Sequence, residues 1–187
     1  MRTILLTIIL FLSSHTPALS DVTFEGAKNE IVILTGSIEI EELDEMLELM
    51  KVKKPTQIIL DSYGGNIRSA ESLARYINNN NISTYVSEVA VCKSACVILF
   101  LAGKKRLCEG ELGVHQARPS KEMEYDIMIS KVAYKYLQRD MGELVTLLNS
   151  FNTPPFVYEK MFKSYDMYDF SKEEIAQINT VKSLDEM

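Results

Sequence analysis

The sequence predicts an α/β domain with a mostly parallel sheet and flanking helices. Short runs of β-branched residues alternate along the chain with amphipathic segments of helical spacing, the order expected for a parallel sheet with right-handed crossovers. The 187 residues suffice for one ordinary domain, and 47% hydrophobic with 25% charged residues is the composition of a globular protein that buries a core. No internal repeat, low-complexity linker or domain boundary interrupts this pattern.

Residues 1–20 have the pattern of a secretory signal peptide. Arg2 precedes a ten-residue apolar run at 3–12, and a polar stretch then ends in Ala18-Leu19-Ser20. The run is half of the roughly 20 residues that span a bilayer, so an uncleaved anchor is the alternative and not the main reading. We therefore expect a signal peptide at 1–20, a single domain at 21–187, and a periplasmic or secreted protein.

In the first half of the domain we expect three strands and three helices. The strands are short β-branched or apolar runs at 30–35, 57–60 and 84–91. The first helix, 38–50, has apolar residues three and four apart, namely Leu43, Met46, Leu47 and Met50. The second follows a turn at 61–65, has Ile67, Ala70, Leu73, Ala74 and Ile77 on one face, and ends in the asparagines 78–81. The third, 94–102, is apolar nearly all round and is closed by Gly103.

The second half continues with two strands and two helical segments. The strands, 105–108 and 112–116, flank a Glu-Gly-Glu turn. A long helical pattern covers 121–151 until Pro154-Pro155 breaks it. A final helix, 171–178, begins with Ser171 and an acidic residue three positions later, the signature of a capping box.

Three local features have the residue types that catalysis needs. Gly64-Gly65 lies in a turn between a strand and a helix, where backbone N–H groups are accessible to negative charge. Ser94 stands at the start of a buried helix, and His115 belongs to a short strand. Each has a structural alternative: a tight turn needs glycines, serine is a preferred N-cap, and a lone histidine often only packs. Since His15 falls in the signal segment, any serine or cysteine mechanism has to use His115.

In this order the features resemble the Clp protease proteolytic subunit of the ClpP/crotonase superfamily. The resemblance runs over residues 30–184, and its specific parts are YGGNIRSAESLARYI, CKSACVILFLAGKKR, GVHQ and SKEEIAQINTV. The cysteines two before and two after Ser94 are most similar to the secreted branch of that superfamily. The resemblance implies a fold of repeated β-β-α units.

The resemblance also implies the roles of the site residues. Ser94 takes the position of the nucleophile and His115 that of the general base, and the backbone N–H groups of Gly65 and Ala95 take the oxyanion-hole positions. Acyl transfer requires these parts: an activated hydroxyl, a base within reach, and donors for the tetrahedral oxyanion.

The third member of the expected triad departs from the family pattern. The family places an aspartate a few residues before the serine of the last helix, and this position is Met167 here. Asp166 lies one residue early and Asp169 two residues late. We assign Asp166, because a one-residue gap in a loop restores the register. Without either carboxylate on His115, activity would be low or absent.

The cysteines and the basic residues leave few further chemistries. In an oxidising compartment Cys92, Cys96 and Cys108 allow one disulfide and one free thiol, and the pairing stays open. Three thiols and one histidine do not form a metal-ligand pattern, so we expect no metal and no cofactor. A Cys/His hydrolase, or a lysine base at Lys93 as in the related signal peptide peptidase A, has no other support in the sequence.

The leading hypothesis is an exported serine hydrolase, a peptidase acting on peptides or unfolded proteins. The alternative is a catalytically inactive ClpP-like module that binds peptides or serves assembly; a crotonase-type use of CoA thioesters fits poorly outside the cytoplasm. The resemblance further implies a homo-oligomer with contacts through 121–151 and, for an exported protein, no cytoplasmic unfoldase. The net charge of −6 with scattered basic residues argues against nucleic acid as a partner.

Overall fold

The computed structural model describes residues 21–25, 30–39, 41, 43–117 and 131–187. The expected signal peptide at 1–20 and the first part of the expected helical run, up to residue 130, lie outside these residues. The strands are β1 (Asp21–Glu25), β2 (Ile31–Ile38), β3 (Gln57–Gly65), β4 (Ser83–Val86), β5 (Val91–Lys93), β6 (Arg106–Cys108), β7 (Glu111–Val114) and β8 (Tyr168–Asp169). The helices are α1 (Leu43–Lys53), α2 (Ile67–Asn79), α3 (Ala95–Ala102), α5 (Lys131–Ser150), α6 (Pro155–Lys163) and α7 (Lys172–Ile178), followed by the 3₁₀ turn η1 (Leu184–Glu186).

The described strands form one mostly parallel sheet that forks at β3. Its main path is β1-β2-β3-β5-β7-β8, and β4 pairs with β3 and with β6. The inner pairings are parallel, whereas β1 with β2 and β7 with β8 are antiparallel. This arrangement confirms the predicted fold class.

The fork results from a repeated β-β-α unit. β4, β5 and α3 form one unit, and β6, β7 and α5 the next. β3 supplies both strand positions of the preceding unit: its first half pairs with β4 at Gln57↔Ser83, and its second half pairs with β5 at Ser62↔Cys92. The units therefore stack in register, β4 on β6 and β5 on β7.

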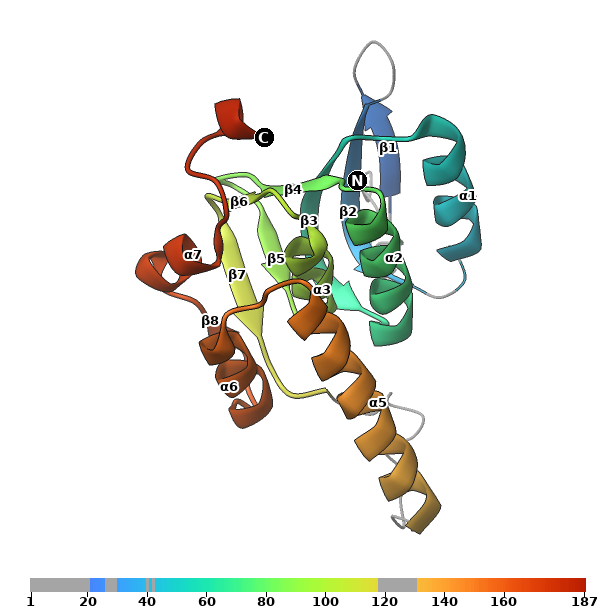
Figure 1. Ribbon diagram of the computed structural model, residues 1–187, viewed down its shortest axis with the longest axis vertical. Coiled ribbons are helices and arrows are strands. Elements are labelled where there is room, and N and C mark those ends of the chain that lie inside the picture. Colours follow the sequence, from blue (N-terminus) through green and yellow to red (C-terminus); the bar gives the residue numbers. More distant parts are fainter. Residues whose placement is uncertain (1–20, 26–29, 40, 42, 118–130) are drawn as a thin grey trace, which may run out of the picture.

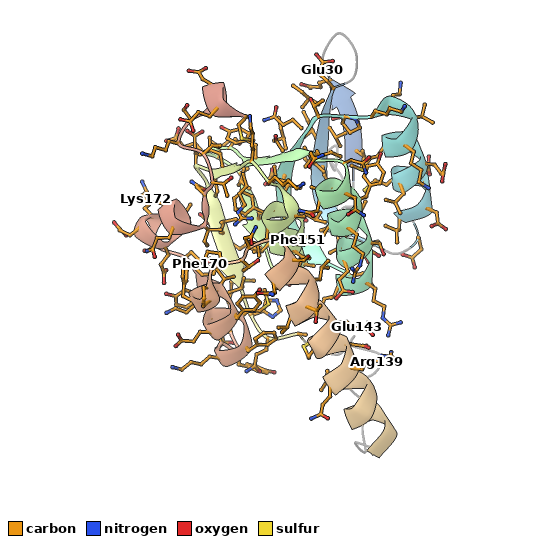
Figure 2. The ribbon with its side chains drawn as sticks, viewed as in Figure 1. Glu30, Arg139, Glu143, Phe151, Phe170 and Lys172 are labelled. Carbon is orange, nitrogen blue, oxygen red and sulfur yellow. A yellow bond between two sulfur atoms is a disulfide. The ribbon has the colours of Figure 1, made fainter. Side chains whose placement is uncertain are left out.

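Helix α3 is the centre of the core. All eight of its side chains are buried, and it contacts β3, α2 and α5. In Figure 1, α2 lies beside α3, and α5 runs from α3 away from the sheet. Figure 2 shows Phe151 at the inner end of α5 and the pair Arg139 and Glu143, 3.6 Å apart, on the part that extends outward. No helix among the described residues combines the length and the apolar character that crossing a membrane requires.

A buried arginine joins the ends of three helices. Arg106 is only 3% exposed. Its guanidinium donates to the carbonyl oxygens of Leu101 (2.7 Å), Phe151 (3.1 Å) and Ile178 (2.8 Å), at the C-terminal ends of α3, α5 and α7. Helix C-termini carry partial negative charge, so they compensate the buried cation. Burial lowers the pKa of Arg106 to about 10, and the side chain stays charged at neutral pH.

Several predicted elements differ from the observed ones. The predicted strand 84–91 is two strands, β4 and β5, separated by a turn in which the Ala90 N–H donates to the Ser87 carbonyl. Pro154-Pro155 ends α5 but also starts α6, because proline is compatible with the first turn of a helix. β7 ends at Val114, so His115 follows the strand instead of belonging to it. The capping box is confirmed: Ser171 and Glu174 exchange both hydrogen bonds.

Candidate active site

The three candidate features occupy equivalent places in successive repeats. Ser62 of β3 pairs with Cys92 of β5, and Cys92 pairs with Leu112 of β7. Just beyond these pairs, β3 ends at Gly65, β5 is followed by Ser94, and β7 is followed by His115. Adjacent parallel strands present their carboxyl ends at the same sheet edge, the usual place for ligand sites in α/β proteins. The repeat therefore brings the diglycine turn, the serine and the histidine to one edge.

The predicted turn at 61–65 is the end of β3, and we keep the name diglycine turn for Gly64-Gly65. A buried serine that the sequence analysis missed holds this pair. The Ser62 side chain is 1% exposed; its hydroxyl accepts from the Gly64 N–H at 3.1 Å and donates to the Gly36 carbonyl. The Asn66 N–H donates to the Ile38 carbonyl at 2.7 Å. None of these hydrogen bonds uses the Gly65 N–H, the group expected in the oxyanion hole.

The turn packs directly on the segment that carries Ser94. Gly64 and Gly65 have φ of 101° and 145°, values that L side chains rarely adopt. A Cβ added to Gly64 would lie 2.8 Å from Ala95 N, Lys93 O and Ser94 Cβ. The glycines thus allow a backbone approach that brings the turn beside the Ala95 N–H.

Ser94 has a strained backbone conformation. Its φ is 54° and its ψ is −125°. Three other described non-glycine residues have positive φ, and these follow the helices α1, α2 and α5: Lys54, Asn81 and Asn152. Ser94 instead begins a helix, in a sharp strand-to-helix turn like those that expose nucleophilic serines in hydrolases. Strain of this kind costs about 1–3 kcal/mol and is concentrated at functional sites.

The contacts of Ser94 argue against the N-cap interpretation. Its N–H donates to the Gly113 carbonyl at 2.8 Å. This hydrogen bond fixes the strand-to-helix turn at 93–95, which we call the elbow, to the strand that precedes His115. The hydroxyl forms no capping hydrogen bond to α3. The backbone thus positions the Ser94 side chain, and its oxygen does not cap the helix.

A disulfide spans the elbow. Cys92, the middle residue of β5, is bonded to Cys96 in the first turn of α3, with 5.2 Å between the Cα atoms. This settles the pairing that the sequence left open, and Cys108 is the free, buried thiol. Burial raises the pKa of Cys108 to about 12. Neither the bonded sulfurs nor a protonated buried thiol supplies a nucleophile, so the structure does not support a Cys/His hydrolase.

Lys93 is engaged in ion pairs. It is 13% exposed at its side chain, and its Nζ lies 2.7 Å from Glu111 Oε2 and 3.0 Å from Asp169 Oδ1. The hydrogen bond to Glu111 is the main cause that raises the pKa of Lys93. Lys93 is therefore a cation joining β5, β7 and β8, which does not suit the role of a base.

His115 has a backbone partner. Its Nδ1 lies 2.6 Å from the Gln116 carbonyl oxygen. Within the part of the chain that the structure describes, the ring forms no ion pair with Asp166 or Asp169. β8 pairs with β7 at Val114↔Tyr168, and extending that register by one residue places Met167 opposite His115. Met167 is thus the strand neighbour of His115, and the assignment of Asp166 as the third triad member stays a prediction.

The site contains no direct hydrogen bond between Ser94 and His115 in the described region. Such contacts are often long without substrate and tighten when it binds. Nor do the described residues contain a group of three or more His, Cys, Asp or Glu side chains placed to hold a metal ion. Gln116, which sequence reasoning did not single out, has its signal in the motif GVHQ next to the histidine.

Comparison with known proteins identifies the fold. No protein-family model and no curated protein sequence matches the chain. Among solved structures, a mutant of ClpP1 from Listeria monocytogenes is similar, with a TM-score of 0.58 and 16% sequence identity over 83% of this chain and 93% of that one. The chain therefore has the ClpP-like fold, as the resemblance implied.

Proposed function

We propose that the protein is a serine hydrolase of the ClpP-like type that cleaves peptides. Ser94 is the nucleophile, His115 the general base, and the N–H groups of Gly65 and Ala95 form the oxyanion hole. The observation that carries this proposal is the strained backbone of Ser94, packed so closely on Gly64 that a Cβ added there would lie 2.8 Å from the Ser94 Cβ.

The reaction follows from these roles. The Ser94 oxygen attacks the carbonyl carbon of the substrate while His115 Nε2 accepts the hydroxyl proton. The two N–H groups stabilise the resulting oxyanion, and the loss of one such donor typically reduces the rate by about 10²–10³-fold. The imidazolium then protonates the leaving amine, and water, activated by the same histidine, hydrolyses the acyl-enzyme.

Export and assembly belong to the same proposal. The Cys92–Cys96 disulfide is the kind of bond that persists in oxidising compartments, which supports a periplasmic or secreted protein. Such an enzyme works without a cytoplasmic unfoldase, on short or already unfolded peptides. Leu137 and Val145 of α5 are 54% and 39% exposed, which supports assembly into a homo-oligomer through this helix.

Labelling with a fluorophosphonate probe tests the activity. We expect the folded protein to be labelled and Ser94→Ala to abolish labelling. Ser87→Ala is the matched control, because Ser87 is also half-buried and lies in the turn before β5. Absence of labelling in a folded wild-type sample, or equal labelling of the Ser94→Ala variant, would contradict the proposal.

A second candidate function is peptide binding without cleavage. The observation that favours it is the absence of a carboxylate on the His115 ring within the described residues. A binding module would retain its affinity for an extended peptide in the Ser94→Ala variant and would not react with the probe. Measuring peptide affinity beside labelling separates the two functions.

A further inference from the structure

The Gln116 carbonyl oxygen meets the ring nitrogen of His115 that a carboxylate binds in a Ser-His-Asp triad. It lies 2.6 Å from His115 Nδ1. We propose that this backbone carbonyl orients His115 for catalysis, and that the Gln116 side chain is the positioning group that fixes it. This inference rests on the proposed function of Ser94 and His115 and names a third member that no aspartate supplies.

Two hydrogen bonds hold the Gln116 residue in place. Its backbone N–H donates to the Ser164 carbonyl at 2.8 Å, and its side-chain Nε2 donates to the Phe162 carbonyl at 2.6 Å. Both acceptors belong to the C-terminal end of α6, where Ser164 N–H is itself bonded to the Lys160 carbonyl. Gln116 is therefore attached to the end of α6 at two points, through its backbone N–H and through its side-chain amide. These two attachments restrict the orientation of the residue that carries the carbonyl.

The chemistry of a carbonyl oxygen determines the tautomer of the ring. A carbonyl only accepts, so Nδ1 has to carry the hydrogen, and Nε2 is left with a lone pair. A general base for a serine hydroxyl needs this tautomer. A neutral carbonyl stabilises the imidazolium less than a carboxylate does, so the proposal implies a slower enzyme than one with an aspartate.

Two residues of the segment opposite His115, Asp169 and Met167, are consistent with a backbone acceptor for the ring. Asp169 is bound by Lys93 at 3.0 Å. Met167 is opposite His115 in the strand register, and its sulfur would lie 3.0 Å from a Cβ added to Gly113. The strand neighbour of His115 is thus apolar, and the hydrogen-bond acceptor that meets the ring is the Gln116 carbonyl.

Nitrogen NMR of the histidine rings tests the orientation without depending on catalysis. We would label the full chain with ¹⁵N-histidine and assign the second ring with a His15→Gln variant. At alkaline pH, where the imidazole is neutral, we expect the Nδ1–H tautomer of His115 in the wild type. In Gln116→Met, which keeps the length but removes the amide donor, we expect both tautomers. A wild-type ring in the Nε2–H form, or a folded Gln116→Met protein with an unchanged tautomer, overturns the proposal.

Labelling kinetics provide the functional measurement. We expect Gln116→Met to lower the limiting rate of fluorophosphonate labelling by about ten-fold at unchanged probe affinity, and to do so more than Asp166→Asn. Replacing a true triad aspartate by asparagine costs about 10⁴-fold, so a loss of that size in Asp166→Asn overturns the proposal. If Gln116→Met does not fold, Gln116→Asn, which keeps an amide on a shorter side chain, is compared instead. Failure of the proposed function would appear separately, as no labelling of the wild type.

Discussion

Replacing Gly64 with alanine inserts a methyl group between the diglycine turn and the Ser94 segment. At φ 101° an alanine backbone is strained by about 1–3 kcal/mol. The new Cβ would lie 2.8 Å from Ala95 N and Lys93 O, which are backbone atoms and cannot rotate away. Overpacking of this kind costs about 1–3 kcal/mol more. We expect a total loss of about 4 kcal/mol in the free energy of unfolding, or about 8–16 °C in Tm for a chain of this size.

The assay compares Gly64→Ala with Gly142→Ala in urea unfolding and in probe labelling. Gly142 lies inside α5, and a Cβ there would meet no atom within 4 Å. Alanine is favoured over glycine in a helix interior by about 1 kcal/mol, so this control should become more stable. Because Gly64→Ala also displaces the Ala95 N–H, we expect its labelling rate to fall by about 10²-fold, as for a lost oxyanion donor.

The two variants should change the free energy of unfolding in opposite directions. A Gly64→Ala protein within about 1 kcal/mol of the wild type would mean that the turn relaxes and that the contact with the elbow is not tight. Equal labelling of the two variants in folded samples would mean that this contact does not shape the reactive site.

Arg106→Met should lower the free energy of unfolding by about 3–5 kcal/mol in urea titrations, because three helix-end carbonyls lose a charged donor. The control is Arg68→Met, which removes an exposed ion pair with Asp140 (3.2 Å) and should change the free energy of unfolding by about 0.5 kcal/mol or less. Burial raises the pKa of Cys108 from 9.0 to about 12, so stability from this thiol is complete below pH 9 and is lost as the unfolded chain ionises. Between pH 9 and 11 the free energy of unfolding of the wild type should fall by about 2 kcal/mol more than that of Cys108→Ala. The double variant Cys92→Ala/Cys96→Ala should lose about 2 kcal/mol of the free energy of unfolding, because the disulfide no longer restricts the unfolded chain to a short closed loop. It should also react with the fluorophosphonate probe about ten-fold more slowly.

Each of these three predictions has a result that would contradict it. An Arg106→Met protein as stable as Arg68→Met would mean that water satisfies the helix ends. Parallel alkaline unfolding curves for the wild type and Cys108→Ala would mean that the thiol is accessible in the fold. A double cysteine variant that labels at the wild-type rate would show that the elbow keeps its conformation without the disulfide, whatever happens to stability.

Periodicity was sufficient to predict the α/β class and most elements, because it reports burial one element at a time; the β-β-α repeat was implied by the resemblance alone. The strand runs and the apolar faces of the helices in 57–116 are short-range patterns, and the three candidate features stand beside them. The break between β4 and β5 was not predicted, because Val89 and Ala90 continue a β-like composition through a turn. Helix α6 was missed because Pro154-Pro155 signals an end and a start with the same residues.

The partners of the site residues could not be predicted, since they depend on contacts between distant segments. The choice among three cysteines is made by the geometry of the elbow, which brings Cys92 and Cys96 to 5.2 Å between Cα atoms and buries Cys108 elsewhere. Lys93 meets Asp169 only because β8 returns antiparallel to β7. The acceptor at His115 is a backbone carbonyl, which every residue has, so no sequence motif could predict it.

The repeat also explains how a strained serine is retained at this edge. Strain of about 1–3 kcal/mol persists only where the surroundings determine the conformation more than once. At Ser94 they do so three times: the Gly113 carbonyl binds its N–H, the disulfide joins the residues on either side, and Gly64 packs on its Cβ. These restraints come from β7, from β5 with α3, and from β3, the neighbouring units of the stack. None of these restraints uses the hydroxyl. Among the described residues the Ser94 oxygen therefore caps no helix, which leaves it available to react as a nucleophile.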